Sequence, residues 1–454
     1  MSDILPSPFP STPEYDFLVQ LREVHFDGDI IKQDLQLYRA PAVNHYALAA
    51  VSAVRMGAKV DDLKTILEGY KRFLATINYT LPPPLSATFP SVNESLPLDE
   101  SNWCEYLCYH HGQDQSNRRF AAFKSFYASL VEKKGVIGTL DYCLPTLAAA
   151  THSFLFHSFI QVSYGLEVVD VDQITRNNYH RYTSKDSNKI YDTDFLSTAL
   201  SLFSIRFPLP PSLLKRWQPP SAPIQCPCKP TSTYTSFFCV EHGCMKMESC
   251  VEHSALQDIF QQVLSRDPTV VDKNILLQIQ EFGQDERVLR LLDKLMVSEG
   301  WSTRTDGNPT SMLEGSSSSP EGSDKPGRPG LSPHRKQVLK TLATLSLNFF
   351  VALGDFTTLH WVTAVRALTV YGSVVDDSVF WSCFHGAWRS ILLSHFLIVH
   401  RDRVKPRTQE QRALLGTYMG HTHANCVPLS VLRVMRRKKN LFVKLNDLHW
   451  PLYF

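Results

Sequence analysis

The stretch GVIGTLDYCLPTLAAATHSFLFHSFIQVSYGLEVVD, residues 135–170, decides the fold, because apolar side chains surround it on nearly all sides. A helix at a protein surface has one apolar stripe and one polar face, whereas a helix that is apolar all round is buried on most faces. We therefore expect residues 135–170 to lie in the hydrophobic core.

Helical periodicity recurs on both sides of this stretch. It is found in residues 40–58, 61–77, 102–112, 117–135, 192–205, 254–267, 285–301, 338–372 and 380–400. No βαβ rhythm, internal repeat or alternating strand pattern accompanies it. The sequence predicts an all-α protein, a large single-core helical domain with a disordered insertion.

Two segments of unusual composition separate the predicted helices. Residues 226–250 are rich in Cys, and residues 306–330 consist largely of Gly, Ser and Pro. The second segment cannot bury enough apolar surface to offset its ordering entropy, so we expect a disordered linker. The predicted organisation is a core in two parts, 1–225 and 335–406, with an insertion at 226–334 and a divergent basic tail at 407–454.

Composition excludes several classes of protein. The 454 residues are 43% hydrophobic and 20% charged, and 46 basic against 44 acidic residues give a net charge of +2. This balance provides no strong field for nucleic acid or an anionic membrane. The first residues lack the basic and apolar regions of a secretory signal, and polar residues interrupt every long apolar run. We expect a cytoplasmic protein with no nucleic-acid partner and no membrane span.

Histidines on apolar helices are the residues best suited to chemistry, since imidazole can bind a metal, carry a proton or polarise a carbonyl. The alternative for each is a hydrogen-bonded core residue. No HExxH motif and no histidine pair at i and i+4 in one helix is present, so spacing alone indicates no metal site. Four segments qualify: His45, His152 with His157, His360, and His395 with His400.

Several motifs are similar to the signatures of one protein family. HSFIQVSYGLE, residues 157–167, is similar to the signature HPxIHLGYxLE, and CLPTLAAATHSFLF precedes it as LPxLAxGxxGAxF does in that family. GDFTTLHWVTAVRAL, residues 354–368, resembles the second signature, GDFxxLHxVTxxxAL. Asn44-His45 and residues 387–406 add weaker matches. The chain thus resembles the questin oxidase-like family over roughly residues 36–80, 120–205 and 335–406.

The resemblance implies a helical oxidoreductase that attacks polycyclic aromatic ketones such as anthraquinones. The reaction is either NADPH-dependent oxygen insertion of the Baeyer–Villiger type or ring cleavage at a histidine-bound non-haem iron. The implied catalytic residues are His157, His360 and Gln161, and the implied metal ligands are His45, His157 and His360. We expect these three histidines to converge in one buried pocket. No Rossmann GxGxxG motif indicates a flavin.

The chain also departs from the family pattern. Gln161 replaces the second histidine of the first signature and is a far poorer iron ligand, although it keeps its hydrogen-bonding capacity. Leu48 and Ala49 stand where the family usually has a further histidine, and its C-terminal aspartate–histidine–lysine helix has no clear counterpart. These departures leave a second hypothesis open, that the chain is a non-catalytic substrate-binding or interaction protein on the same fold.

Two further features stand apart from the resemblance. Cys226, Cys228, Cys239, His242, Cys244 and Cys250 could hold one structural zinc ion, or they could form a loop of free thiols. A zinc-stabilised interaction protein is therefore a third hypothesis. The basic run RVMRRKK, Arg433 to Lys439, is more typical of a solvated tail than of a site for RNA or lipid.

Overall fold

The described residues of the computed structural model are helical almost throughout, which confirms the all-α prediction. They comprise residues 58–76, 97–107, 113–168, 191–217, 238–239, 244–245, 251–266, 275–298, 331–353 and 356–404, with Pro13, Ala50 and Ala53. The elements are α4 (Val60–Thr76), η4 (Trp103–Tyr106), α5 (Gln113–Leu147), η5 (Ala148–Ala150), α6 (His157–Val168), α8 (Tyr191–Ile205), α9 (Pro211–Leu214), β1 (Phe238–Cys239), β2 (Cys244–Met245), α10 (Val251–Arg266), α11 (Ile275–Phe282), α12 (Glu286–Ser298), α13 (Pro333–Leu353), α14 (Phe356–Gly372) and α15 (Asp377–Val404). Among these residues, β1 and β2 form a single antiparallel pair of two residues each.

Most of residues 135–167 are buried, as expected, but this segment is not one continuous helix. Gly135 has φ 74° and ψ 173°, so the helical path of α5 breaks where the Lys-Lys-Gly sequence predicts a helix end. The second half of α5 leads into the 3-10 turn η5, and α6 begins at His157 after a non-helical connection. The chain thus crosses the core in three short pieces.

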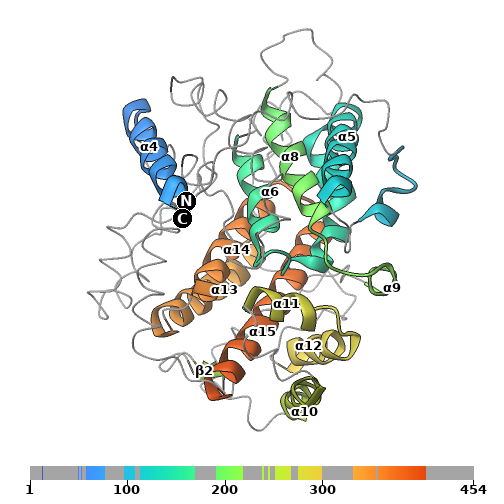
Figure 1. Ribbon diagram of the computed structural model, residues 1–454, viewed down its shortest axis with the longest axis vertical. Helices are drawn as coiled ribbons and strands as arrows, with labels where there is room; N and C mark the ends of the chain where they lie inside the picture. Colours follow the sequence, from blue (N-terminus) through green and yellow to red (C-terminus); the bar gives the residue numbers. More distant parts are fainter. Residues whose placement is uncertain are drawn as a thin grey trace, which may run out of the picture.

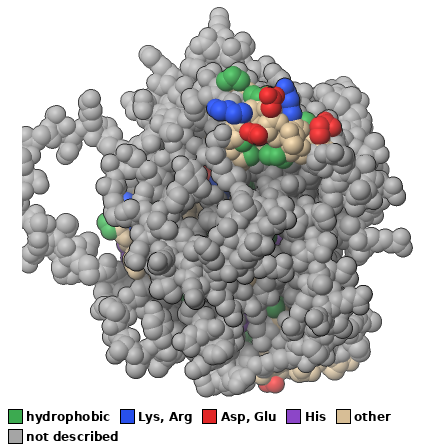
Figure 2. All heavy atoms as spheres, turned by 90° about the vertical axis from the view of Figure 1, so that its left-hand side faces the viewer, with side chains coloured by type: hydrophobic (Ala, Val, Ile, Leu, Met, Phe, Trp, Pro, Cys, Tyr) green, Lys and Arg blue, Asp and Glu red, His purple; other side chains and the backbone are tan. Residues whose placement is uncertain are grey.

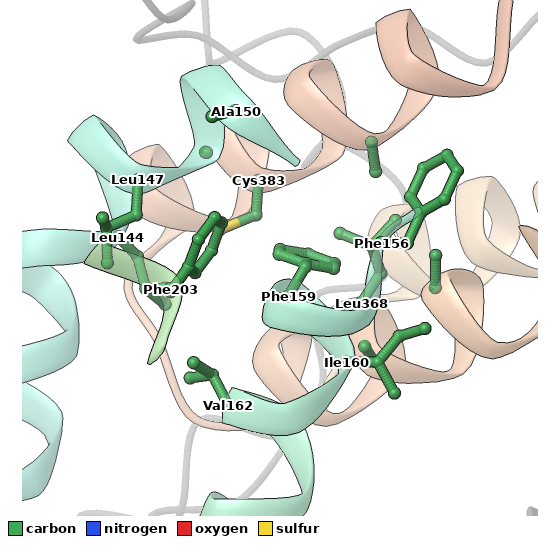
Figure 3. Packing of buried hydrophobic residues seen from close by; sticks show 14 of the residues in the cluster. Leu144, Leu147, Ala150, Phe156, Phe159, Ile160, Val162, Phe203, Leu368 and Cys383 are labelled. Atoms are coloured by element: carbon green, nitrogen blue, oxygen red, sulfur yellow. The ribbon is translucent and has the colours of Figure 1, made fainter. Parts of the chain in front are cut away.

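The helix α6 lies in the middle of the molecule (Figure 1). It packs against α8 on one side and α14 on the other, while α5 covers α8 and α13 covers α14. Figure 3 shows Phe159 and Val162 of α6 among buried side chains of the neighbouring helices, including Leu144 of α5, Phe203 of α8 and Leu368 of α14. Helices on both sides of the predicted insertion therefore share one core.

A second group of helices surrounds the lower part of α15 (Figure 1). Both α11 and α12 pack on α15, and α10 packs on α12. Leu256, Ile279 and Leu292 from these three helices belong to the same buried cluster as the centre of the molecule. The range expected to be an insertion, 226–334, therefore contains helices that contribute to the core.

The helix α4 shows the amphipathic pattern predicted for residues 61–77. Leu63 and Leu67 are buried, whereas Asp61, Asp62 and Lys64 are exposed. Figure 2 shows acidic and basic side chains close together on the part of the surface where Figure 1 places α4. The mixture of signs agrees with the near-zero net charge.

Other expectations have different outcomes. The helix expected over 102–112 is a single 3-10 turn, η4, in the part that is described. The predicted linker 306–330 and the tail 407–454 lie outside the described residues. Within the described helices, none has the combined length and hydropathy needed to cross a bilayer.

We predict that Gly386→Ala strongly destabilises the protein. A Cβ atom at this position of α15 would lie 2.0 Å from the carbonyl oxygen of Ala148. The backbone in a tightly packed core cannot move far enough to relieve this clash. Overpacking of this kind costs about 1–3 kcal/mol or more in the free energy of unfolding. Urea unfolding measures the loss.

The matched control is Gly372→Ala, whose Cβ would meet the far end of the Leu331 side chain at 2.8 Å and the ring of Phe380 at 3.0 Å. Side-chain ends can move, so this substitution should be the milder of the two. Equal losses would contradict the close approach of α15 to η5.

Candidate functional site

The first histidine of the candidate site, His157, begins α6 directly after an unusual turn. Phe154, Leu155 and Phe156 have φ values of 53°, 55° and 67°, which is one left-handed turn built without glycine. Each such residue costs roughly 1–2 kcal/mol relative to the right-handed conformation. Strain of this kind persists only where surrounding structure determines it, and it is often found at functional sites.

The turn places a backbone carbonyl against the imidazole of His157. The carbonyl oxygen of Phe154 lies 2.7 Å from His157 Nδ1 and also accepts the His157 backbone N–H at 3.2 Å. A carbonyl can only accept, so Nδ1 carries the proton. In the neutral ring, Nε2 of His157 then presents a lone pair.

The second histidine, His360, meets this lone pair from α14. The two Nε2 atoms are 3.1 Å apart, and the rings lie edge to face with centroids 4.5 Å apart. His157 is 5% exposed and His360 1% exposed. With both rings neutral, His360 donates its Nε2 proton to His157, so the hydrogen bonds run from His360 through His157 to the carbonyl of Phe154.

The third predicted residue, Gln161, lies one helical turn after His157 and is also buried. Its amide oxygen accepts a hydrogen bond from Nη1 of Arg206 at 3.3 Å. The same guanidinium lies over the ring of Phe154, 4.5 Å from its centroid. Gln161 thus belongs to the surroundings of His157, linked to the turn through Arg206.

A buried ion pair joins the same two helices beyond the histidines. Nη2 of Arg366, on α14, lies 2.6 and 2.7 Å from the two carboxylate oxygens of Glu167, on α6. The guanidinium also lies over the ring of Tyr164 at 4.6 Å. The Glu167 and Arg366 side chains are only 3% and 10% exposed. This ion pair opposes sliding of α6 along α14.

Phe156, Phe159 and Trp361 lie close to the two histidines in sequence and are fully buried. Trp361 donates from its indole nitrogen to Ser394 on α15 at 2.8 Å, and Tyr371 donates to the carbonyl oxygen of Phe159 at 2.5 Å. The setting is one of low polarity, in which hydrogen bonds and charges act more strongly than in water.

His157 and His360 could supply two ligands of a metal site. Two nitrogen ligands about 2.1 Å from one metal ion lie roughly 3 Å apart when they subtend a near-right angle, close to the separation seen here. A ligating histidine usually donates its other N–H to a carbonyl or carboxylate, as His157 does. The described residues include no group of three or more His, Cys, Asp or Glu side chains arranged for a metal. A complete site needs a further ligand, and the predicted one, His45, lies outside the described residues.

The structure places two of the remaining candidate histidines beside other groups. Nε2 of His152 lies near Gly283, the residue after α11, because a Cβ atom at Gly283 would come within 2.6 Å of it. His395 of α15 is buried with its ring centroid 5.8 Å from that of Trp361. The side chain of His400 lies outside the described residues.

A second polar cluster, which the sequence did not indicate, centres on Arg389 of α15. Arg389 donates to the carbonyl oxygen of Ala149 at 2.8 Å and lies over the ring of Trp217 at 4.3 Å. Asp293 is 3.8 Å from Arg389 and 3.4 Å from His385. Burial, aided by the charge of Arg389, lowers the pKa of both His152 and His385 to about 3.

The cysteine-rich segment is described only in part. Cys239 and Cys244 pair through their backbones as the ends of β1 and β2. Their side chains, and the other residues of the predicted zinc-or-thiol cluster, lie outside the described residues.

In comparisons with protein family models, curated proteins and solved structures, nothing matched this chain.

We predict that Glu167→Gln costs about 3–5 kcal/mol in the free energy of unfolding, because it leaves the buried charge of Arg366 without its carboxylate. Replacing both residues, as Glu167→Met with Arg366→Met, should recover much of this loss. Urea unfolding at one pH measures both. The exposed pair of Lys64 with Asp61 gives the control, and Lys64→Met should change little. A loss in Glu167→Gln as small as that of the control would contradict the buried pair.

We also predict that His152 makes the protein less stable in acid. The pKa of His152 is about 3 in the folded protein, below the ordinary value of 6.5. Below pH 6.5 the imidazole therefore binds a proton in the unfolded chain but stays neutral in the folded protein. The free energy of unfolding should fall by about 2 kcal/mol for this residue between pH 6.5 and pH 5. His152→Asn should remove that part of the decline.

Unfolding curves measured at pH 8, 6.5, 5.5 and 5 test the prediction. The two proteins should differ by a constant amount above pH 7, where this imidazole is neutral in both states. Parallel declines in acid would show that His152 is not the source.

Proposed function

We propose that this chain is an oxidoreductase of the questin oxidase-like type, which acts on a polycyclic aromatic ketone at His157 and His360. The observation that carries the proposal is the 3.1 Å separation of their Nε2 atoms. The two histidines come from the two motifs that carry the family resemblance, 203 positions apart in the chain. The two motifs that carry the resemblance thus meet at their histidines.

The pair offers both partners of a general acid–base step. The Nε2 proton of His360 can be donated to a ketone oxygen, and the Nε2 lone pair of His157 can accept a proton. The Phe154 carbonyl keeps the proton of His157 on Nδ1, so His157 needs no tautomer change before it acts. The buried surroundings would strengthen a hydrogen bond from the pair to the carbonyl group of a ligand.

Molecular oxygen would be the oxidant, and it would react by one of two routes. In the first route, the ketone, O₂, NADPH and one proton react to give water, NADP⁺ and an ester, in which one oxygen atom has been inserted beside the carbonyl group. The nicotinamide supplies the two electrons. With non-haem iron, His157 and His360 would hold the ion through Nε2, together with His45, and the metal would activate oxygen for ring cleavage. In both cases Gln161 would help to orient the ligand, with its amide oxygen held by Arg206.

A second candidate function is binding of the same class of ligand without turnover. Gln161 stands in place of the second histidine of the family signature, which supports this candidate. A pocket that has lost a metal ligand can still bind an aromatic ketone by burial and hydrogen bonding.

The decisive experiment incubates the purified protein with an anthraquinone-type ketone, with and without NADPH and ferrous iron. Oxygen consumption and product mass are recorded. We expect turnover in the parent protein and at least a 100-fold lower rate in His157→Asn and in His360→Asn, since a positioned acid or base contributes about 10²–10⁴-fold. His334→Asn, an exposed residue of α13, is the control and should keep the parent rate.

The outcomes separate the candidates. Parent-like turnover in His157→Asn would contradict the proposed site. Saturable ligand binding without turnover under any condition would favour the binding protein. Gln161→His tests the iron route, because it restores a better ligand: more bound iron by mass spectrometry and faster oxygen uptake support it, and an unchanged nonzero rate supports the metal-free route.

A further inference from the structure

The left-handed turn before His157 needs an explanation, because Phe154, Leu155 and Phe156 would each be more stable in a right-handed conformation. Leu155 and Phe156 are buried at 3% and 0% exposure, so their side chains anchor the end of the turn in the core. Phe156 is one of the packed residues in Figure 3. Phe154 is more accessible, and it is the residue whose carbonyl holds His157.

Arg206 makes three contacts around this turn, one of them with the ring of Phe154. Its guanidinium lies 4.5 Å from the ring centroid of Phe154, within the range of a cation–π interaction. Its own carbonyl oxygen accepts a hydrogen bond from the hydroxyl of Ser153 at 2.6 Å. Its Nη1 donates to the amide oxygen of Gln161 at 3.3 Å. Arg206 follows the last residue of α8, so a separate helix supplies these contacts.

The partners of Arg206 lie on both sides of His157 in the chain. Ser153 and Phe154 precede it, and Gln161 follows it by one helical turn. The guanidinium therefore links the strained turn to the first turn of α6, the turn that begins at His157. Movement of Phe154 would remove the acceptor of the Nδ1 proton, and both tautomers of the ring would then become accessible.

We propose that Arg206 is a positioning residue, which holds the Phe154 carbonyl on His157 Nδ1 and so keeps the Nε2 lone pair directed at His360. Its importance for a reaction rests on the proposed function, whereas its effect on the imidazole does not. The planar guanidinium can stack on a ring and donate sideways at the same time. A lysine ammonium keeps the charge but lacks this shape.

The test is nitrogen NMR on protein with ¹⁵N-labelled histidine, since the chemical shifts of Nδ1 and Nε2 distinguish the two tautomers. The His157 signals are assigned by their absence in His157→Asn. In the parent, Nδ1 should carry the proton. In Arg206→Met the Nε2–H tautomer should rise about fivefold relative to Nδ1–H, the factor expected when a hydrogen bond of ordinary net strength is lost. Arg206→Lys should give an intermediate value.

Two further variants keep the test decisive. Arg216→Met removes an exposed arginine that pairs with Glu286, and it should leave the His157 signals unchanged. Phe154→Leu retains the carbonyl but removes the ring, so it should shift the tautomers in the same direction as Arg206→Met, and it replaces that variant should Arg206→Met not fold. Parent-like His157 signals in a folded Arg206→Met or Phe154→Leu protein would overturn the inference.

The tautomer measurement and the turnover assay fail independently. A tautomer shift in Arg206→Met, in a protein that oxidises no ketone, would support the positioning role and count against the proposed function. An unshifted tautomer together with reduced turnover would place the role of Arg206 elsewhere and contradict the inference.

Discussion

The packing of α6 against α14 is the constraint on which the rest of the structure depends. Three polar links cross this buried interface: His157 with His360, Glu167 with Arg366, and the Tyr371 hydroxyl with the carbonyl of Phe159. Buried polar groups are tolerated only when they are paired. A shift of one helix along the other would leave all three links unsatisfied at once, so the polar contacts determine the register that apolar packing alone would leave loose.

The surrounding helices support this interface. The long helix α15 contacts α14, α5 and η5, and its close approach to Ala148 requires glycine at position 386. The turn between η5 and α6 absorbs the change of direction that places His157 at the start of α6. Its strain is tolerated because Leu155 and Phe156 are buried and Phe154 lies against Arg206. Stability in the core thus maintains a local geometry that is unfavourable by itself.

Much of the helical structure could be predicted from the sequence, because 3.6-residue periodicity is strong in segments such as 61–77 and 285–301. The break at Gly135 was predictable too, since Lys-Lys-Gly is a common helix end. The left-handed turn was not: Phe154, Leu155 and Phe156 include no glycine, and tertiary packing overrides their preference. Neither was the place of α10 to α12 in the core, because the Cys-rich and Gly-rich segments beside them suggested an insertion.

The candidate site, too, could be predicted from the sequence only in part. Spacing alone gave no reason to join His157 to His360, and only the resemblance of their two motifs suggested it. His45, the third predicted histidine, lies outside the described residues. Arg206 could not be found from the sequence, because its role depends on a contact between the end of α8 and the turn before α6. Local sequence indicates helices well, whereas polar contacts across a core depend on how those helices pack.

The central claim is that the imidazoles of His157 and His360 are hydrogen-bonded to each other through their Nε2 atoms. The most direct test is the scalar coupling between these two nitrogens across the hydrogen bond, measured by NMR on chelator-treated protein with ¹⁵N-labelled histidine at neutral or mildly alkaline pH. The account predicts a coupling between the Nε2 signals of these two residues that disappears in His360→Asn. Sharp Nε2 signals from both residues with no mutual coupling would contradict it.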